Sequence, residues 1–494
     1  MPTHTLYRPS LGLLTDLYEL TMAHGYWKTG LAQREAVFNL FFRENPFGGG
    51  YTVACGLADV VELLEQFGFD DQDLGYLSTL RGADGQPLFE PAFLEHLARL
   101  RLSCDIDAIA EGTAVFPNEP LLRVQGPLIE AQILESPLLN IINFQTLIAT
   151  KAARVCSAAG EDPVLEFGLR RAQGIDGALA ASRAAYIGGC AATSNVLAGR
   201  LLGIPVSGTH AHSWVMLFDS EIEAFEAYAE AMPNNCTFLV DTYDSLQGID
   251  HAIEVGRRLS SRGHELLGIR LDSGDLAFLS DEARRRLDAA GFTEATIAAS
   301  SDLDERIITS LKQQGAKINV WGVGTRLVTG HEQPALGGVY KLAASRDPGG
   351  SWRPKIKLSE QAAKISTPGR LQVRRFSNGP TFVADMIYEV DRPLQTPWTI
   401  VDPTDITRRR LIPAAGDPDP LPFEELLQPL FRRGKRVAKG PDLAQIRHRT
   451  REQMAQLHAG IKRFVNPHSY PVGLEKGLHR FKTEMILAAR GLDR

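Results

Sequence analysis

Between residues 163 and 342, short apolar runs alternate with amphipathic helical segments, and this alternation constrains the fold more than any other feature. The runs are Pro163–Phe167, Ile204–Val206, Thr237–Val240, Leu266–Leu271, Thr296–Ala299 and Ile318–Trp321. Strands that alternate with helices predict a parallel sheet with right-handed crossovers. Polar side chains follow nearly every run, which favours a barrel, since an open sheet would gather its ligand at one switch point. We therefore predict an irregular β/α barrel.

The segments on either side of the barrel have different patterns. Residues 1–140 mix helical segments such as Leu13–Trp27 with strand-like segments such as Ala36–Arg43. After Lys341 the alternation stops. We expect an N-terminal mixed α/β domain at 1–140 and a barrel catalytic domain at 141–345. A C-terminal extension at 346–494 is expected to pack partly on the N-terminal domain.

Composition excludes several classes of protein. The chain is 44% hydrophobic and 23% charged, as in ordinary globular proteins, and no apolar run is long enough to span a membrane. The N-terminus lacks the apolar core of a signal peptide. The five scattered cysteines have no metal-ligand spacing, so we expect reduced thiols, a cytoplasmic location and no zinc site. A net charge of −6 argues against nucleic acid as the main partner.

A glycine-containing loop, VWGVGTR, spans residues 320–326. Gly322 and Gly324 would let backbone N–H groups approach a ligand, and Thr325 adds a hydroxyl. The end of a late barrel strand is the usual place for a phosphate site. A tight turn needed only for packing is the alternative. The sequence contains no GxxxxGK[ST] motif, which excludes a Walker A loop.

Arg270 and Asp272 stand two residues apart at the end of another run, and so share one face of it. A carboxylate there would accept hydrogen bonds from sugar hydroxyls, and the guanidinium would bind an anion in a bidentate manner. A surface salt bridge is the alternative. Asp275 is expected to cap the following helix.

His212 ends the segment SGTHAH, which follows the run at 204–206. A carboxylate such as Asp241, at the end of the next run, would hold one ring nitrogen and leave the other as a nucleophile or base. A purely structural histidine is the alternative. His210 lies two residues earlier and would share the same face, so the sequence does not decide between the two histidines.

Six segments, in order, resemble the nicotinate phosphoribosyltransferase family of type II phosphoribosyltransferases. They are Leu14–Trp27 (LTDLYELTMAHGYW), Glu166–His212, Leu239–Asp244, Ile269–Asp275, Trp321–Val328 and Gln333–Leu342. The resemblance covers nearly the whole chain and implies an irregular β/α barrel beside an α/β domain. It implies phosphoribosyl transfer from phosphoribosyl diphosphate to nicotinate in NAD biosynthesis or salvage, giving nicotinate mononucleotide and pyrophosphate. It further implies coupling to ATP hydrolysis, a requirement for Mg²⁺, and a homodimer with shared active sites.

The resemblance also implies roles for single residues. His212 matches the histidine that ATP phosphorylates transiently, and Asp241 matches the acid that orients the phosphorylated ring. His210 departs from the family motif, which has one histidine in this segment. For nicotinate, the implied contacts are Thr209 and Arg270, together with Tyr18 from the partner subunit. Arg170 is implied to lie near the pyridine and phosphate, and Asp272 to accept hydrogen bonds from the ribose hydroxyls. The implied phosphate contacts are Gly322, Gly324 and Thr325.

Asn195 bears on the choice of base. Relatives that use nicotinamide carry an acid at this position, and an acid would repel a carboxylate ligand, so Asn195 predicts nicotinate over nicotinamide. Three alternatives are a nicotinamide or quinolinate phosphoribosyltransferase, a sugar-phosphate isomerase or aldolase, and a regulatory relative without turnover. The isomerase or aldolase would need a Lys or Glu base at a strand end, where this chain has Arg, His and Asp.

Overall fold

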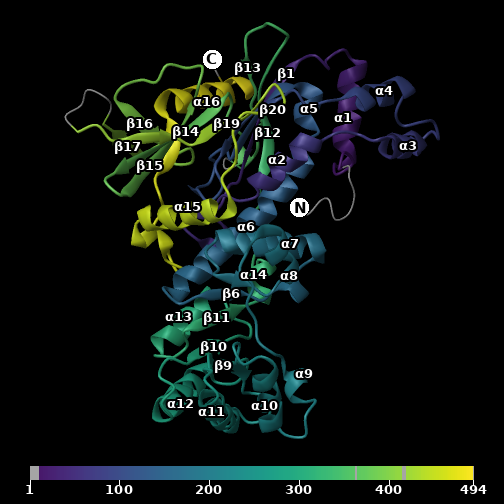
Figure 1. Cartoon of the computed structure of the whole chain (residues 1–494). Helices are drawn as coiled ribbons and strands as arrows, with labels where there is room; N and C mark the ends of the chain where they lie inside the picture. Colours follow the sequence, from purple (N-terminus) through teal and green to yellow (C-terminus); the bar gives the residue numbers. More distant parts are fainter. Residues whose placement is uncertain (1–10, 362–363, 414–418, 493–494) are drawn as a thin grey trace. The chain divides into compact units, whose positions relative to one another are not determined.

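The computed structural model describes residues 11–361, 364–413 and 419–492 (Figure 1). The first ten residues, on which the absence of a signal peptide was judged, lie outside this range. The chain forms two compact units. One unit comprises Met1–Leu147 together with Ala335–Arg494, and the other comprises Ile148–Pro334.

The second unit is built on a parallel sheet of six strands in the order β7-β6-β11-β10-β9-β8. The strands are β6 (Val164–Glu166), β7 (Ala192–Thr193), β8 (Thr237–Leu239), β9 (Gly268–Leu271), β10 (Thr296–Ala299) and β11 (Val320–Val323). The helices are α7 (Gly174–Ile187), α8 (Val196–Leu202), α9 (His212–Val215), α10 (Glu221–Ala231), α11 (Ser245–Ser261), α12 (Leu276–Ala289), α13 (Glu305–Gln313) and α14 (Thr325–Val328), with the 3-10 turn η3 (Leu169–Arg171). The alternating parallel β/α class predicted from the sequence is confirmed.

Aspartates fix where several of these helices begin. Asp244, Asp275 and Asp304 precede α11, α12 and α13, and each accepts hydrogen bonds from backbone N–H groups of the first turn. Such caps satisfy donors that a helix start leaves unpaired. The cap expected at Asp275 is confirmed, and each cap fixes the end of the loop that precedes its helix.

The prediction of a regular strand at Ile204–Val206 is wrong. Val206 forms a single parallel bridge to Thr193 of β7, and the expected alternation omitted the short β7. Pro205 has no N–H group and Gly203 is left-handed at φ 70°, so the segment is poorly suited to a regular ladder. The chain nevertheless continues toward β8, where the ring of His210 accepts a hydrogen bond from the N–H of Leu239. The barrel is thus irregular at this position.

The first unit contains two larger sheets. One has the order β13-β12-β1-β5-β3-β19-β20 and the other β17-β16-β21-β15-β14-β18. The strands are β1 (Glu35–Phe41), β2 (Thr52–Val53), β3 (Asp105–Ile109), β4 (Ala114–Val115), β5 (Leu122–Pro127), β12 (Val339–Arg346), β13 (Arg353–Pro354), β14 (Leu371–Asn378), β15 (Thr381–Glu389), β16 (Trp398–Val401), β17 (Arg409–Ile412), β18 (Phe423–Glu425), β19 (Leu427–Arg432), β20 (Lys435–Arg436) and β21 (Val472–Glu475). The helices are α1 (Leu17–Lys28), α2 (Leu57–Gln66), α3 (Asp71–Thr79), α4 (Pro91–Arg99), α5 (Leu128–Gln132), α15 (Leu443–Gln456) and α16 (Lys476–Ala489), while α6 (Glu135–Ala159) runs from this unit into the second.

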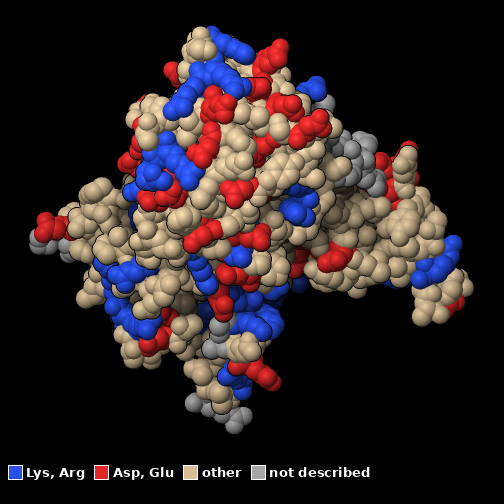
Figure 2. All heavy atoms as spheres, turned by 90° about the horizontal axis from the view of Figure 1, so that it is seen from below, with Lys and Arg blue, Asp and Glu red and all other residues tan. Residues whose placement is uncertain are grey.

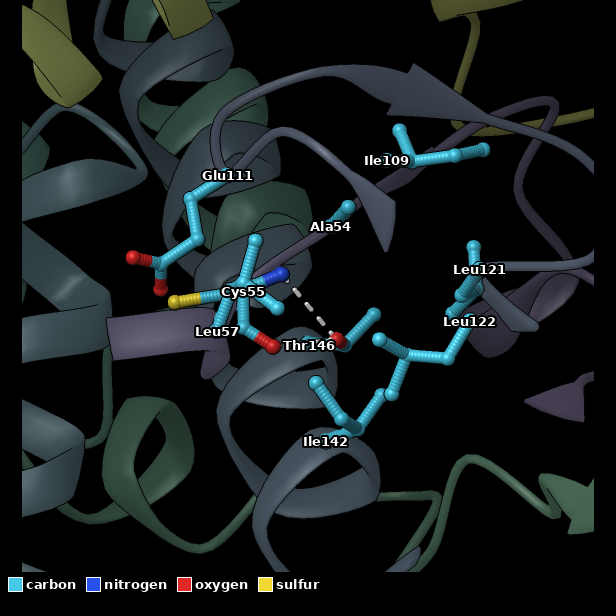
Figure 3. Close-up of a pocket in the computed structure, with 9 residues that line it drawn as sticks. All are labelled: Ala54, Cys55, Leu57, Ile109, Glu111, Leu121, Leu122, Ile142 and Thr146. Carbon is cyan, nitrogen blue, oxygen red and sulfur yellow. Dashed lines mark hydrogen bonds between the residues drawn. The ribbon is translucent and has the colours of Figure 1, made fainter. Parts of the chain in front are cut away.

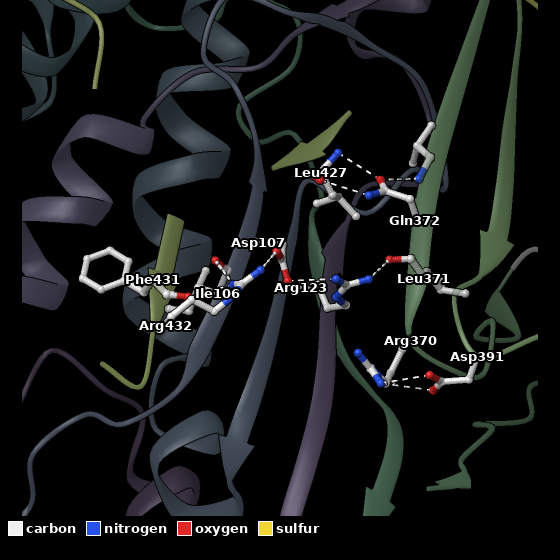
Figure 4. A network of polar contacts seen from close by, with 11 residues as sticks. Ile106, Asp107, Arg123, Arg370, Leu371, Gln372, Asp391, Leu427, Phe431 and Arg432 are labelled. Carbon is white, nitrogen blue, oxygen red and sulfur yellow. Dashed lines mark hydrogen bonds and ion pairs between the residues drawn. The ribbon is translucent and has the colours of Figure 1, made fainter. Parts of the chain in front are cut away.

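The C-terminal extension shares a sheet with the N-terminal segment. Strand β19 pairs with β3, and β12 pairs with β1, so residues from both ends of the chain form one antiparallel sheet. Arg123 of β5 donates to Asp107 of β3 at 2.8 Å and to the carbonyl of Leu371 at 2.6 Å (Figure 4). Arg432 of β19 donates to the same aspartate. Residues 346–492 therefore belong to the first unit, while the boundaries expected at 140 and 345 lie near the limits of the second.

Candidate active site

An open cavity lies at the carboxyl ends of the central strands of the second unit, which Figure 1 labels β9, β10 and β11. Its volume is ≈ 150 Å³. It is lined by Phe167, Arg170, Arg171, Arg270, Asp272, Ser300, Ser301, Asp302, Gly322, Gly324 and Thr325. Enzymes with parallel β/α sheets bind their ligands at this edge. Three arginines and two aspartates suit a ligand that carries both anionic groups and hydroxyls.

Arg270 joins three loops of the site. Its Nε donates to Ser300 Oγ at 2.8 Å, one Nη donates to Thr209 Oγ1 at 3.0 Å, and the other donates to Asp272 Oδ1 at 2.8 Å. The side chains of Arg270 and Asp272 are 14% and 31% exposed. The pair therefore lies in the cavity wall, which excludes the surface salt bridge considered from the sequence.

The carboxylate of Asp272 is held in its charged form. Partial burial would raise its pKa, but hydrogen bonds from Ser300 and Arg270, with the charge of Arg270, outweigh burial and lower the pKa below its ordinary value. Asp272 is consequently an anion at neutral pH and can only accept hydrogen bonds. That property suits a contact to sugar hydroxyls.

At positions 322 and 324 of the 320–326 loop, a side chain would collide with different atoms of Phe167. A Cβ at Gly322 would lie 2.7 Å from the ring of Phe167, and a Cβ at Gly324 would lie 3.0 Å from the carbonyl oxygen of Phe167. The same ring lies 5.7 Å from the guanidinium carbon of Arg270. Packing thus requires glycine at 322, in agreement with the alternative that the loop is a tight turn needed for packing. Both glycines also line the cavity, together with Thr325 at the start of α14.

His212 begins α9 close to this cavity. Its Nδ1 lies 3.1 Å from Thr242 Oγ1, and its Nε2 lies 3.7 Å from Asp272 Oδ2. The side chain is 39% exposed, so a ligand can reach the ring. His212 and Asp272, which the sequence places in different loops, are therefore neighbours.

Asp241 acts on the loop of Asp272. Its Oδ2 accepts from the backbone N–H of Asp272 at 2.8 Å and from Ser273 Oγ at 2.7 Å. Its Oδ1 is buried and has no hydrogen-bond partner among the described residues. In this structure the ring nitrogens of His212 face Thr242 and Asp272, and the expected contact with Asp241 is not formed among the described residues.

His210 occupies a different environment from His212. Its ring is buried against Tyr228, with centroids 4.9 Å apart, and burial lowers its pKa to about 4. Its Nε2 accepts from the backbone N–H of Leu239 at 3.3 Å. The structure therefore separates two histidines that the sequence could not, because only His212 is accessible beside the cavity.

Comparisons with known proteins agree with this geometry. Three protein-family models match the chain: the nicotinate phosphoribosyltransferase N-terminal domain at residues 13–143, the family itself at 164–345, and the C-terminal domain at 371–482. The nicotinate phosphoribosyltransferase of Bacillus subtilis is 43% identical over 482 residues, covering 97% of this chain and 95% of that protein. The chain belongs to the nicotinate phosphoribosyltransferase family.

Solved structures support the same assignment. The crystal structure of human nicotinic acid phosphoribosyltransferase matches with a TM-score of 0.82 at 32% identity, covering 95% of this chain and 99% of that one. A nicotinate-nucleotide pyrophosphorylase from Pyrococcus furiosus matches with a TM-score of 0.68 at 22% identity, which shows a shared fold. The expected fold class, an irregular β/α barrel with an α/β N-terminal domain and a C-terminal extension, is confirmed.

Asn195, which the family comparison linked to base choice, lies in a buried polar cluster. Its Oδ1 accepts from the N–H of Ala198 and caps α8, while its Nδ2 donates to Ser182 Oγ at 3.3 Å. Ser182 and Thr193 both donate to Glu166. Asn195 is not among the residues that line the cavity, so an influence on the base would pass through this cluster.

The remaining expected residues divide between the two units. Arg170 is exposed in η3 and lines the cavity, with Arg171 beside it. Tyr18 is exposed on α1 of the first unit, where burial and the nearby Glu135 raise the pKa of its hydroxyl. An exposed Tyr18 is compatible with the predicted contact to another subunit, which stays a prediction.

Ser300 and Ser301 were not expected as site residues, although polar side chains were expected to follow nearly every apolar run. Ser300 donates to Asp272 and accepts from Arg270, and Ser301 adopts φ 101°, which non-glycine residues rarely do. Backbone strain of this kind gathers at functional sites. The pair follows β10 directly, so the rule that polar residues follow strands was the available signal.

A network of ion pairs connects the end of the 320–326 loop to the start of α13. Arg326, next to Thr325, is bonded to Asp304 at 2.5 Å. The adjacent Glu305 forms ion pairs with Lys151 Nζ at 2.7 Å and with Arg154 Nε at 2.8 Å, and all three side chains are 1% exposed. Asp304 thus joins the start of α13 to the end of the loop.

A second cavity, in the first unit, is far smaller. Its volume is ≈ 10 Å³, room for about one water molecule. Cys55, Glu111 and Thr146 lie along it (Figure 3). Glu111 already accepts from the N–H groups of Gly56 and Ala58 at the start of α2, so this cavity has the features of a helix cap rather than a ligand site.

Other expectations concern metals, membranes and charge. In the described ranges, no group of three or more His, Cys, Asp or Glu side chains could hold a metal ion, and no helix is long and apolar enough to cross a membrane. None of the five cysteines, all of which lie in the described ranges, forms a disulfide bond. Basic and acidic side chains are interspersed on the face drawn in Figure 2.

Proposed function

We propose that the protein transfers the phosphoribosyl group of phosphoribosyl diphosphate to nicotinate, giving nicotinate mononucleotide and pyrophosphate in NAD biosynthesis or salvage. The observation that carries the proposal is the cavity in which Arg170, Arg270 and Asp272 meet the 320–326 loop. Family membership supplies the substrate class. The cations would bind phosphate and carboxylate groups, and Asp272 would accept hydrogen bonds from the ribose.

Transfer at the anomeric carbon breaks its bond to the diphosphate oxygen and forms a bond to the pyridine nitrogen. The ribose passes through an oxocarbenium-like state, and negative charge grows on the departing pyrophosphate. Asp272, an anion, is suited to stabilise the developing positive charge. Arg170 and the N–H groups of the glycine loop are suited to stabilise the leaving group.

Nicotinate is proposed over nicotinamide because cations surround the cavity. Arg270 is held by Thr209, Ser300 and Asp272, so its guanidinium is fixed in orientation before the base arrives. A fixed guanidinium favours a carboxylate over a neutral amide. Asn195 would influence the choice of base through the capped start of α8. The substitution Asn195→Asp is expected to narrow the preference for nicotinate over nicotinamide.

We further propose that ATP hydrolysis drives the reaction through His212. Its Nε2 would form a bond to the γ-phosphorus as ADP departs and the ring loses a proton to solvent; water would later release phosphate and restore the imidazole. The Nε2 atom is favoured because Nδ1 faces the hydroxyl of Thr242. Asp241 would act by holding Asp272 at its backbone, close to the ring.

Mg²⁺ is proposed to arrive with the diphosphate. Mg²⁺ usually binds one or two carboxylates together with substrate phosphates, rather than a cage made of protein alone. Asp272 and Asp302 line the cavity and supply such carboxylates. When bound, the ion would neutralise charge on the leaving pyrophosphate.

We propose a cytoplasmic homodimer whose sites are completed by the partner subunit. Both units have exposed apolar side chains that a second copy would cover. They are Leu14, Leu17, Tyr18 and Met22 in the first unit and Leu169, Ile175, Val196, Val206, Met216 and Leu217 in the second. Five cysteines without a disulfide bond are in keeping with a reducing compartment.

The test is pyrophosphate release from phosphoribosyl diphosphate with nicotinate, nicotinamide or quinolinate, each with and without ATP. Release with nicotinate, increased by ATP and accompanied by ADP, is expected. Release with another base would overturn the choice of base, and no release with any base would overturn the function. Asp272→Asn should lower kcat by on the order of a hundredfold. Asp275→Asn, three residues away, is the matched control, since an asparagine still caps α12.

A further inference from the structure

His210 is the feature that the proposed chemistry leaves unused. Its ring is buried beside Phe225, Tyr228 and Phe238, with centroids 6.0, 4.9 and 6.3 Å away. A hydrophobic side chain of similar size would fill such a place equally well. The polar atoms of the ring must therefore be considered for a separate role.

The Nε2 atom of His210 meets an N–H group at the edge of the sheet. In a strand, successive N–H groups point to opposite sides. The N–H of Val240 bonds to the carbonyl of Arg270 on the β9 side, so the N–H of Leu239 points to the other side of β8. Leu239 is fully buried, and its N–H donates to His210 Nε2 at 3.3 Å. A buried N–H group without a partner would be costly.

The protonation state of the ring agrees with this arrangement. Burial lowers the pKa of His210 to about 4, so the ring is neutral near pH 7. The Nδ1 atom lies 3.5 Å from the carbonyl oxygen of Ala211. A proton on Nδ1 directed at that carbonyl leaves Nε2 as the acceptor that Leu239 requires.

The segment that this bond holds carries two residues of the site. On one side, Thr209 Oγ1 donates to the carbonyl of His210 at 3.0 Å and accepts from Arg270 at 3.0 Å. On the other side, His212 follows after one residue and faces Thr242 and Asp272. At its start, the segment is joined to β7 by the Val206 bridge and by the bond from Ser207 N to Thr193 O at 3.1 Å.

We propose that His210 is a positioning residue, whose Nε2 replaces the missing strand-to-strand hydrogen bond between the 207–211 segment and β8 and so fixes Thr209 and His212 in the site. The inference deepens the proposed function and rests on it for the roles of Thr209 and His212. The hydrogen bond to Leu239 does not depend on those roles.

The test compares three substitutions. His210→Gln places an amide oxygen near the Nε2 position, His210→Asn places one nearer Nδ1, and His210→Phe keeps the aromatic packing without an acceptor. Hydrogen–deuterium exchange of the peptide that contains Leu239 measures the bond directly. Steady-state kinetics with nicotinate and phosphoribosyl diphosphate, with and without ATP, measures the position of Thr209 and His212.

We expect faster exchange at Leu239 and on the order of tenfold lower kcat/KM for nicotinate in the Phe and Asn variants, together with a weaker stimulation by ATP. The Gln variant should stay close to the parent protein in each measurement. If His210→Phe does not accumulate as folded protein, the Asn and Gln variants make the same comparison.

Two outcomes would overturn the inference. Parental exchange and kinetics in His210→Phe would mean that the ring serves packing alone. Equal damage in the Gln and Asn variants, with unchanged exchange at Leu239, would mean that an acceptor at Nε2 is not what matters. If the parent protein releases no pyrophosphate with nicotinate, the proposed function fails, whereas the exchange comparison still decides whether His210 holds β8.

Discussion

The substitution Glu305→Gln tests the network of ion pairs that connects the start of α13 to the 320–326 loop. Glu305 begins α13 and forms ion pairs with Lys151 Nζ at 2.7 Å and Arg154 Nε at 2.8 Å, and all three side chains are 1% exposed. Burial alone would raise the pKa of Glu305, but the charges and hydrogen bonds of Lys151 and Arg154 outweigh it and lower the pKa. Glutamine keeps the shape of the side chain and removes its charge.

The expected cost follows from two cations that lose their buried anion. Breaking a buried ion pair by removing one partner destabilises a protein by about 3–5 kcal/mol. That is a large part of the 5–15 kcal/mol, roughly, that stabilises a typical domain. Glu332→Gln is the matched control, because Glu332 faces Arg306 at 3.6 Å on the surface, where a pair contributes about 1 kcal/mol or less.

Urea unfolding followed by tryptophan fluorescence measures both changes. Trp321 of β11 is fully buried in the same unit and reports on it. Glu305→Gln should lower the unfolding midpoint clearly, while Glu332→Gln should leave it nearly unchanged. Equal midpoints for the two variants would refute the reasoning, since burial would then have no influence on the cost of losing the charge.

Three further predictions concern the site. Gly322→Ala places a Cβ 2.7 Å from the Phe167 ring and should raise KM for phosphoribosyl diphosphate by roughly tenfold; an unchanged KM would count against a close approach of the loop to phosphate. His210 should make stability fall as pH decreases from 6.5 to about 4, because the unfolded state binds a proton first. The loss should reach about 3 kcal/mol, and His210→Gln should remove that part of the pH dependence in denaturant titrations. Thr242→Val should weaken ATP stimulation by about fivefold without changing the rate measured without ATP, and equal effects on both rates would contradict its role at His212.

Much of the fold could be predicted because its signals are local. The apolar runs at β8, β9, β10 and β11 lie where expected, since each is short, buried and bounded by polar residues. The run at 204–206 failed because its pairing depends on Pro205, which cannot donate to a ladder. The two-residue strand β7 gave no periodic signal at all.

The site could be predicted in its residue types but not in its partners. Arg270 and Asp272 share a strand end, and their contact follows from the spacing of two residues. The partners of His212 come from two other loops, and which side chain meets the ring depends on loop conformation. That is why Asp241 was expected at a position where Thr242 and Asp272 lie. Asn195 was expected to influence the choice of base, and which groups its side chain meets depends on the turn that begins α8, where it caps the helix.

The shared sheet of the first unit has a consequence for the order of synthesis. Strand β3 emerges from the ribosome more than three hundred residues before its neighbour β19. The whole second unit, by contrast, is contiguous from Ile148 to Pro334 and contains its own parallel sheet. Since domains generally fold as units during translation, the catalytic unit can fold while the N-terminal strands still wait for their partners. A truncated chain that ends before residue 427 would leave one edge of β3 unpaired, and so exposed to aggregation.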